Sequence, residues 1–165
     1  MKRTAHVICI AVVLALIAPG HAAAADKFAP FTLKALDGSS HSLSDVRGKS
    51  KATLVAFFYP TCPYCNASFP EVQKIYDTYK ARGLSMVWIN VVPTEESLIA
   101  GWQKEHGYTV PVLRGDRTVA MTYNVRGTPT HYLLDAKGQV LWTHAGYEAG
   151  DEHELEQSIR RALGL

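Results

Sequence analysis

The feature that most constrains the fold is an apolar run followed at once by two cysteines. Residues 52–59 (ATLVAFFY) show no apolar-polar alternation and are rich in β-branched and aromatic side chains. A short run of this kind is typical of a strand covered on both faces, as in the centre of a mainly parallel sheet. Cys62 and Cys65 follow, where the spacing of apolar residues changes from strand to helix. The sequence therefore predicts two thiols beyond the end of a buried strand.

The rest of the pattern predicts an α/β domain. It indicates strands at residues 31–36 and 84–92, helices at 66–82, 94–106 and 151–163, and a β-hairpin at 130–147. Residues 37–51 read as an irregular segment closed by Gly48, and no element is assigned to residues 108–129. This order predicts a central mixed β-sheet with helices on both faces.

The N-terminus has the layout of a secretory signal peptide. Lys2 and Arg3 precede the apolar residues 7–18, and a run of small residues ends at Ala25. The apolar run is shorter than the about 20 residues that cross a bilayer comfortably. We therefore expect a cleaved signal at residues 1–25, with a retained membrane anchor as the alternative. The remaining residues 26–165 suit one domain.

Charge and cysteine content limit the partners of this domain. Without Lys2 and Arg3 it has 15 basic residues, equal to its 15 acidic residues. Balanced charge offers no electrostatic footprint for nucleic acid and no basic face for anionic lipid. The domain keeps two cysteines, Cys62 and Cys65, which can form a disulfide in the oxidising compartment that an exported protein meets.

The position of Cys62 favours a reactive thiol. At the start of a helix, a thiolate faces unpaired backbone N–H groups and the positive end of the helix dipole, which lower thiol pKa values to roughly 3.5–7.5. Pro63 suits the first turn because no N–H is needed there. Cys65 lies one turn further on, close enough for a short-range disulfide.

Three other roles for the pair are weaker. A structural staple would close too short a loop to restrict the unfolded chain much. An inert pair would lie inside an element rather than at its end. A zinc site would need a second pair of ligands, but the histidines are scattered, and we expect each to be a surface or satisfied core residue: His41, His106, His131, His144 and His153. The pattern favours a redox-active pair that needs neither a metal nor another cofactor.

A resemblance to a known family rests on motifs at both ends of the domain. PTCPYC after a buried strand, a proline within the next helix, and VRGTPTHYLLDAKGQVL downstream resemble the exported TlpA/ResA-like thiol-disulfide oxidoreductases of the thioredoxin superfamily. The resemblance covers nearly all of residues 26–165 and implies a thioredoxin fold. It implies that Cys62 is the attacking thiol, that Cys65 is the resolving thiol, and that Pro129 is a cis-proline beside them. Thr128 would offer its backbone to a substrate.

The first departure from the family concerns the proton of Cys65. Many thioredoxins carry a buried acid at the position of Ala56, so the proton acceptor must come from elsewhere in this chain. ResA-like proteins have a glutamate that approaches the site after the central strand, and Glu95 or Glu96 matches it here. An equally good interpretation is that both glutamates only favour a helix N-terminus.

The second departure is the Pro63-Tyr64 dipeptide, which is more similar to glutaredoxins than to TlpA. No glutathione-binding pattern accompanies it. We therefore expect Tyr64 to tune the site and to contact substrate. The substrate surface should surround Cys62, Tyr64, Thr128 and Pro129.

The resemblance implies a monomeric protein-disulfide reductase in the periplasm, with protein thiols and disulfides as substrates. Its kind keeps apocytochrome c or copper-site thiols reduced and takes electrons from a membrane dithiol donor. The direction of electron flow is not fixed by sequence, because it depends on reduction potentials.

Two other functions stay open, besides a purely structural interaction domain. A peroxiredoxin-type peroxidase has its threonine three residues before the reactive cysteine, whereas Thr61 is adjacent to Cys62. A thioredoxin-fold copper chaperone has three residues between its cysteines and a distal histidine. Here two residues separate them, although His131 and His144 lie downstream.

Overall fold

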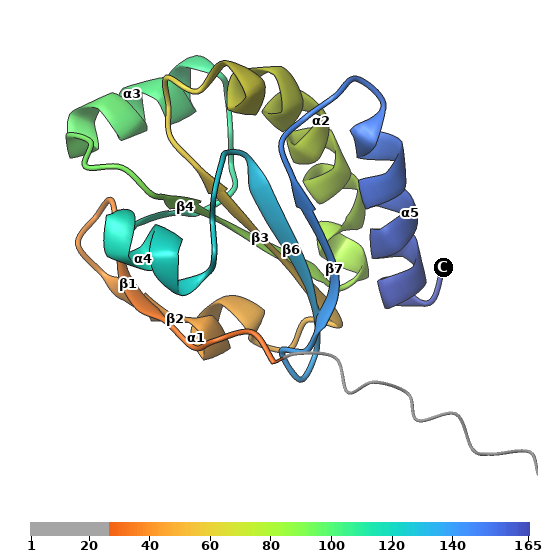
Figure 1. Cartoon of the computed structure of the whole chain (residues 1–165). Coiled ribbons are helices and arrows are strands. Elements are labelled where there is room, and N and C mark those ends of the chain that lie inside the picture. The colour runs from red at the N-terminus through yellow and green to blue at the C-terminus, as the bar shows by residue number, and fades with distance from the viewer. Residues whose placement is uncertain (1–26) are drawn as a thin grey trace, which may run out of the picture.

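A seven-stranded mixed sheet forms the centre of the protein in the computed structural model, which describes residues 27–165 (Figure 1). The strand order is β2-β1-β5-β4-β3-β6-β7. The strands are β1 (Thr32–Ala35), β2 (Ser40–Ser42), β3 (Ala52–Phe58), β4 (Leu84–Asn90), β5 (Val112–Arg114), β6 (Thr130–Asp135) and β7 (Val140–Ala145). β3, β4 and β5 run parallel to one another, and β6 pairs antiparallel with both β3 and β7. The expected signal peptide at residues 1–25 lies outside the described residues.

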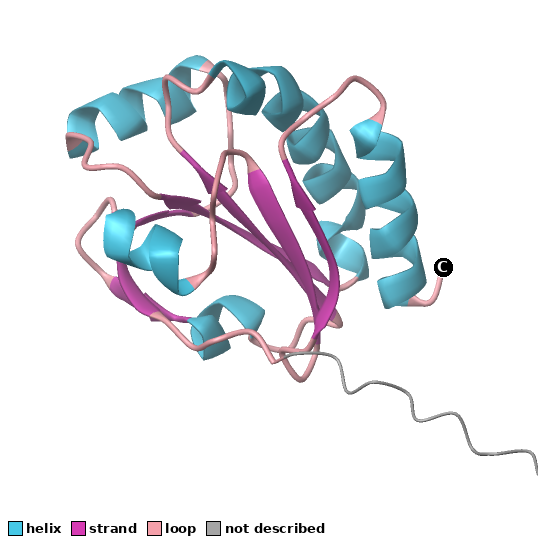
Figure 2. Cartoon of the chain, in the orientation of Figure 1, coloured by secondary structure: helices cyan, strands magenta, loops and turns pink. Residues whose placement is uncertain are grey.

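Helices cover both faces of this sheet (Figure 2). One face carries α2 (Pro63–Tyr79), α3 (Glu96–Glu105) and α5 (Asp151–Leu163), and the other carries α1 (Leu43–Arg47) and α4 (Arg117–Thr122). A short 3₁₀ helix, η1 (Lys80–Arg82), continues α2. Within residues 27–165, no helix combines the length and the apolar character needed to span a membrane.

The α/β thioredoxin fold predicted from the sequence is confirmed. Every residue of β3 is buried, because the strand lies between β4 and β6 with helices above and below it. The predicted hairpin is β6 and β7, and the closing helix is α5. Acids in the first turn of α5 and arginines in its last turn complement the helix dipole.

Four short elements were missed in the sequence. β2 and α1 occupy the segment read as irregular, and β5 and α4 occupy residues left unassigned. Each has three to six residues, too few for an apolar period to show. Their N-cap residues could have been recognised in the sequence. In α1, Ser42 accepts from the Asp45 amide and Asp45 accepts from the Ser42 amide. In α4, Asp116 accepts from the Val119 amide.

The sheet separates two hydrophobic cores. Alternate residues of β3 divide between them, with Ala56 and Phe58 facing α2, and Phe57 facing α4. The first core, beneath α2, α3 and α5, contains Trp88 and both cysteines. The second core, beneath α1 and α4, contains Phe28, Phe57 and Tyr123. The thiols thus belong to one face of the sheet only.

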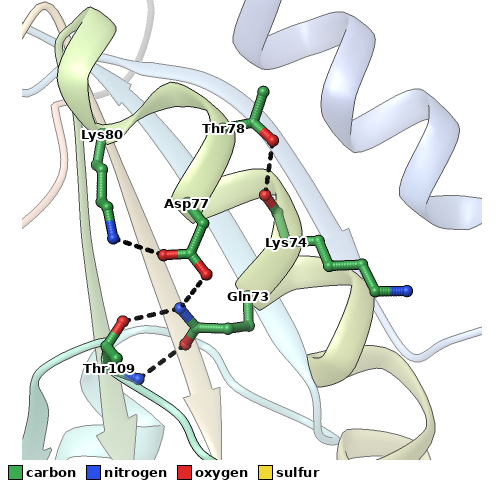
Figure 3. Close-up of polar contacts among 6 residues, drawn as sticks. All are labelled: Gln73, Lys74, Asp77, Thr78, Lys80 and Thr109. Atoms are coloured by element: carbon green, nitrogen blue, oxygen red, sulfur yellow. Dashed lines mark hydrogen bonds and ion pairs between the residues drawn. The ribbon is translucent and has the colours of Figure 1, made fainter.

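A polar clamp holds α2 against the segment that leads into β5 (Figure 3). The Gln73 amide nitrogen donates to Thr109 Oγ1 (2.9 Å), and its oxygen accepts from the Thr109 backbone amide (3.0 Å). The same nitrogen contacts Asp77, which also pairs with Lys80 (2.6 Å). Since Gln73 is buried, these bonds fix α2, and with it the cysteines, relative to the sheet.

Candidate active site

Cys62 is the N-cap of α2. The chain leaves β3 at Phe58, and the Cys62 amide donates to the Tyr59 carbonyl (3.1 Å) in the turn that follows. The Cys62 sulfur accepts from the Cys65 backbone amide at 3.2 Å, as an oxygen of serine or aspartate does in an ordinary cap. Pro63 occupies the first helical turn, where it removes no hydrogen bond. The sulfur is therefore held at the positive end of a helix of 17 residues.

The loop before β6 completes the surroundings of Cys62. The Thr128-Pro129 peptide bond is cis. Thr128 Oγ1 donates to the Cys62 sulfur (3.3 Å), and the Cys62 thiol donates to the Thr128 carbonyl (3.4 Å). Residues 66 positions apart in sequence thus meet at one sulfur. Two donors and one acceptor around it can serve both the thiol and the thiolate.

Cys65 differs from Cys62 in its surroundings. Both are free thiols buried in the first core, with 1% of Cys62 and none of Cys65 exposed, but the hydrogen bonds of Thr128 go to the Cys62 sulfur. Burial raises the pKa of Cys65 well above the ordinary value for a thiol, and the neighbouring Cys62 sulfur adds to the rise. Cys65 is therefore kept protonated at neutral pH.

Tyr64 and Asn66 lie on either side of Cys65 in sequence, Tyr64 exposed to solvent and Asn66 hydrogen-bonded to neighbouring segments. Tyr64 follows the first cysteine by two residues and is 61% exposed, and its expected contact with substrate stays a prediction. Asn66, which sequence reasoning missed, donates to the Pro60 carbonyl (3.0 Å) and accepts from Trp102 Nε1 (2.8 Å). It thereby ties α3 to the turn that carries Cys62. An asparagine in the second turn of a helix is a polar signal that could have been found, but its partners lie in remote segments.

The two candidate glutamates lie at the start of α3. Glu95 precedes the helix as its N-cap residue without a side-chain cap bond, and Glu96 forms an ion pair with Arg114. Both line a surface hollow of about 1190 Å³ that also contains Thr61. In the described part of the chain, neither makes a hydrogen bond to a cysteine. The structure thus brings them to the same side of the molecule as the site but not into contact with Cys65.

The histidines are mostly as expected, with one exception. His41, His106 and His153 lie at or near the surface, and His144 pairs with Asp151 at 3.0 Å. His131 is buried, and its Nε2 has no hydrogen-bond partner, so the expectation of a satisfied core residue was wrong for it. The sequence could not show that this nitrogen lacks a partner, because the surroundings of His131 depend on how β6 pairs with β3. Nowhere in residues 27–165 do three His, Cys, Asp or Glu side chains gather closely enough to hold a metal ion.

Comparison of the structure with solved proteins defines its class. A thiol:disulfide interchange protein of the thioredoxin family from Chlorobium tepidum TLS superposes with a TM-score of 0.73 at 25% identity, covering 86% of this chain and 99% of that one. StoA from Bacillus subtilis gives a TM-score of 0.64 at 23% identity, covering 79% and 96%, and shares the fold. A thioredoxin fold with a dithiol at the start of α2 is the class of thiol-disulfide oxidoreductases.

Sequence relatives narrow this class. A profile of the Redoxin family matches residues 23–159, and the chain belongs to that family. Thioredoxin-like protein YneN of Bacillus subtilis (strain 168) is 31% identical over 131 residues, which cover 78% of this chain and 74% of YneN. Thiol-disulfide oxidoreductase ResA of Geobacillus kaustophilus is 34% identical over 112 residues, covering 67% and 62%. The predicted TlpA/ResA-like relationship is thereby confirmed, and the protein is a thiol-disulfide oxidoreductase.

Proposed function

We propose that the protein is an exported reductase that uses Cys62 and Cys65 to reduce disulfides of other exported proteins. The observation that carries this proposal is the asymmetry of the two thiols. Both thiols are buried, but Cys62 Sγ accepts hydrogen bonds from the Cys65 amide and from Thr128 Oγ1 at a helix N-terminus, whereas the pKa of the Cys65 thiol is raised. An attacking thiol needs thiolate character, and a resolving thiol must wait until a mixed disulfide forms.

The reaction has two exchange steps. The Cys62 thiolate attacks one sulfur of the substrate disulfide, forming a mixed disulfide and releasing the other substrate sulfur as a thiolate that takes up a proton. Cys65 then loses its proton and attacks Cys62 Sγ. The second substrate thiol leaves, so the substrate gains two electrons and two protons while the Cys62–Cys65 disulfide forms.

The substrate surface would surround the exposed Tyr64 and the Thr128-Pro129 loop. The carbonyl of Thr128 already approaches Cys62 (3.4 Å), so a bound polypeptide could pair with this loop. Glu95 and Glu96 remain candidates for proton transfer through the hollow that they share with Thr61. No cofactor other than the dithiol is required.

The compartment and the partners belong to the same proposal. The signal-like residues 1–25 support export, with residues 26–165 as the mature domain in the periplasm. Relatives named thiol-disulfide oxidoreductase ResA support exchange with protein thiols, and the proposal takes disulfides of apocytochrome c or of copper-site proteins as the substrates and a monomer as the active form. Because that compartment is oxidising, the reductase would need a membrane dithiol donor.

The reduction potential tests the direction of the reaction. The purified protein is equilibrated with glutathione or dithiothreitol buffers, and free Cys62 and Cys65 thiols are trapped and counted. A potential near or below that of thioredoxin, about −270 mV, supports the reductase. A potential near −120 mV would mean an oxidant that introduces disulfides, and the proposed direction would be wrong.

The alternative functions have less support. A copper chaperone would need a histidine beside both thiols, and among residues 27–165 neither His131 nor His144 gathers with the two cysteines into a group that could hold a metal ion. A peroxidase would need its threonine on the preceding turn, and Thr61 is adjacent to Cys62. Tight Cu(I) binding by the reduced protein, or rapid peroxide consumption without a thiol donor, would revive them.

A further inference from the structure

The second exchange step raises the question of where the proton of Cys65 goes. Cys65 has no exposed surface, so its proton cannot leave directly to water. The strand that ends before the cysteines offers no acid at this point, because Ala56 occupies the buried position. Neither Glu95 nor Glu96 makes a hydrogen bond to Cys65, and Glu96 is paired with Arg114, so a group within the first core is the better-placed acceptor.

His131 lies on the same face of the sheet as the cysteines. In the antiparallel pair β3–β6 it stands directly opposite Ala56, so the two side chains point to the same face. Its ring lies 6.2 Å from the ring of Phe69 on α2. His131 is only 4% exposed, and its Nε2 has no partner among the described residues. A buried imidazole nitrogen without a partner costs stability, so the position calls for an explanation other than packing.

A small cavity joins His131 to the helix that carries Cys65. Its volume is about 20 Å³, enough for one water molecule, and Ser68 and His131 both line it. Ser68 is one turn beyond Cys65, and its hydroxyl approaches the Cys65 carbonyl (3.5 Å). Residues one turn apart on a helix have Cβ atoms about 5–6 Å apart, a span that one water can bridge.

The same cavity continues toward the surface. His144 stands opposite His131 in the pair β6–β7 and also lines the cavity. Its Nε2 contacts the Asp151 carboxylate at 3.0 Å, and both side chains are somewhat more than a quarter exposed. A row of proton-carrying groups therefore runs from the buried His131 to solvent.

We propose that His131 receives the proton of Cys65 during resolution of the mixed disulfide and passes it outward through His144 and Asp151. This inference rests on the proposed dithiol function and names a residue that the cysteine motif does not include. His131 acts on Cys65 through Ser68 or a water in the cavity, so it is a positioning and proton-transfer residue rather than one that touches substrate.

The balance of this step is simple. The Cys65 S–H bond breaks, and its electron pair stays on sulfur to attack Cys62 Sγ. A neutral imidazole accepts the proton on its free nitrogen and releases the proton of its other nitrogen toward His144, so His131 ends neutral. The substrate thiolate leaves from Cys62 and takes a proton from solvent.

Burial keeps His131 neutral at physiological pH. The titratable groups that share the cavity with His131 are His144 on β7, Tyr147 in the loop after it, and Asp151 and Glu152 at the start of α5, while α2 contributes Ser68 and β3 contributes no titratable group. Burial, with a smaller contribution from the nearby His144 and against the opposing effect of Asp151, lowers the pKa of His131 to about 4. A neutral ring keeps the lone pair that proton acceptance requires.

The test separates the two exchange steps. The reduced mature protein, residues 26–165, in which Cys62 and Cys65 are the two thiols, is mixed in excess with 5,5′-dithiobis(2-nitrobenzoate) in a stopped-flow instrument between pH 5.5 and 9. Attack by Cys62 releases one coloured thiolate, and resolution by Cys65 releases the second. The variants are His131→Phe, which fills the site without a proton acceptor, and His131→Gln, which keeps hydrogen bonding. His153→Gln, on the exposed face of α5, is the matched control.

The expected result is that both His131 variants leave the first release unchanged and slow the second by about 10²-fold at pH 7. The second rate should then rise about tenfold per pH unit, because hydroxide alone removes the proton, whereas the unsubstituted protein should show a flatter profile. Unchanged second release in both variants would overturn the inference, as would normal rates in His131→Gln alone.

Other outcomes are also decisive. Thermal unfolding checks each variant, and if His131→Phe does not fold, His131→Gln carries the test. If the unsubstituted protein shows no second release, or does not reduce insulin disulfides, the proposed function fails rather than the role of His131. If the His131 variants release both thiolates and the rate of the second release keeps the pH dependence of the unsubstituted protein, the dithiol function stands and proton transfer through His131 is excluded.

Discussion

The two faces of the sheet differ in how many buried polar atoms lack a hydrogen-bond partner. In the second core, the Tyr123 hydroxyl contacts the carbonyls of Ala29 (3.1 Å) and Pro30 (3.2 Å), and the Tyr132 hydroxyl donates to the Tyr123 carbonyl (2.7 Å). On the face of the first core, Trp88 Nε1, the Tyr108 hydroxyl and His131 Nε2 have no partner among the described residues, whereas on the face of the second core this holds for Arg47 Nε of α1.

This difference suits a first face that carries the reactive thiols and a second face that mainly stabilises the fold. A buried polar atom without a partner costs about 1–3 kcal/mol, so the first core gives up stability on the face that holds the thiols. The second core has satisfied tyrosines and stacked rings, with Phe28 and Tyr123 centred 4.6 Å apart. Substitutions on the two faces should therefore have different consequences, which the following measurements can test.

The largest expected effect is that of Cys62→Ser. Serine is a good N-cap residue, so α2 and the free energy of unfolding should change little. The nucleophile is lost, so insulin-disulfide reduction should fall by at least about 10³-fold. Urea unfolding and a turbidity assay check the two parts. Residual activity above one tenth would mean that chemistry does not depend on this thiol.

The second effect is a loss of stability in acid that arises from His131. Its pKa is about 4 in the folded protein and about 6.5 when unfolded, so the unfolded state binds the extra proton first as pH falls. The contribution is fully present above about pH 6.5 and lost towards pH 4, a difference of about 3 kcal/mol. Urea unfolding of the unsubstituted protein and of His131→Phe between pH 4 and 7 measures it. Parallel profiles would contradict the prediction.

The third effect appears in alkali and concerns Cys65. Because its pKa is raised in the folded protein, the unfolded thiol loses its proton first as pH rises above about 8.5. Stability of the reduced protein should then fall by at most about 1.4 kcal/mol per pH unit. Urea unfolding from pH 7 to 10, with Cys65→Ala as control, isolates this slope. If both proteins lose stability equally, the buried thiol is not its source.

The smallest expected effect is that of Tyr123→Phe, a substitution in the second core. Tyr123→Phe removes a hydroxyl that contacts two carbonyls, so the free energy of unfolding should fall by about 1 kcal/mol. The rates of both thiolate releases should stay the same, because Tyr123 lies on the face away from the thiols. A slowed Cys62 reaction in this variant would show that the two cores are not independent.

Much of the fold was predictable from local pattern. The continuous apolar run of β3, the acidic start of α5 and the hairpin of β6 and β7 are long or well capped, so each is legible within its own residues. The elements β5 and α4 were not predictable, because they have only three and six residues. Such short elements show no apolar periodicity and are stabilised by neighbours such as β4, which pairs with β5. Short elements depend on tertiary pairing, which no local window contains.

The site divides in the same way. The cysteines were predictable because their chemistry follows from position at a helix start, and the cis geometry at Pro129 matches the expectation from the family resemblance. Asn66 and His131 were missed because their roles depend on remote partners, Trp102 for one and the register opposite Ala56 for the other. The pairing of strands, more than the motif, determines what surrounds Cys65.

The capping sulfur of Cys62 has a consequence for the helix itself. An ordinary N-cap oxygen has one chemical state, whereas this sulfur can be a thiol, a thiolate or half of a disulfide, and the Cys65 amide bonds to it (3.2 Å). Each change in the oxidation state of Cys62 therefore changes the strength of the N-cap hydrogen bond in the first turn of α2. Hydrogen exchange at the Cys65 amide would report the redox state of the protein from within its backbone, without any label on the thiols.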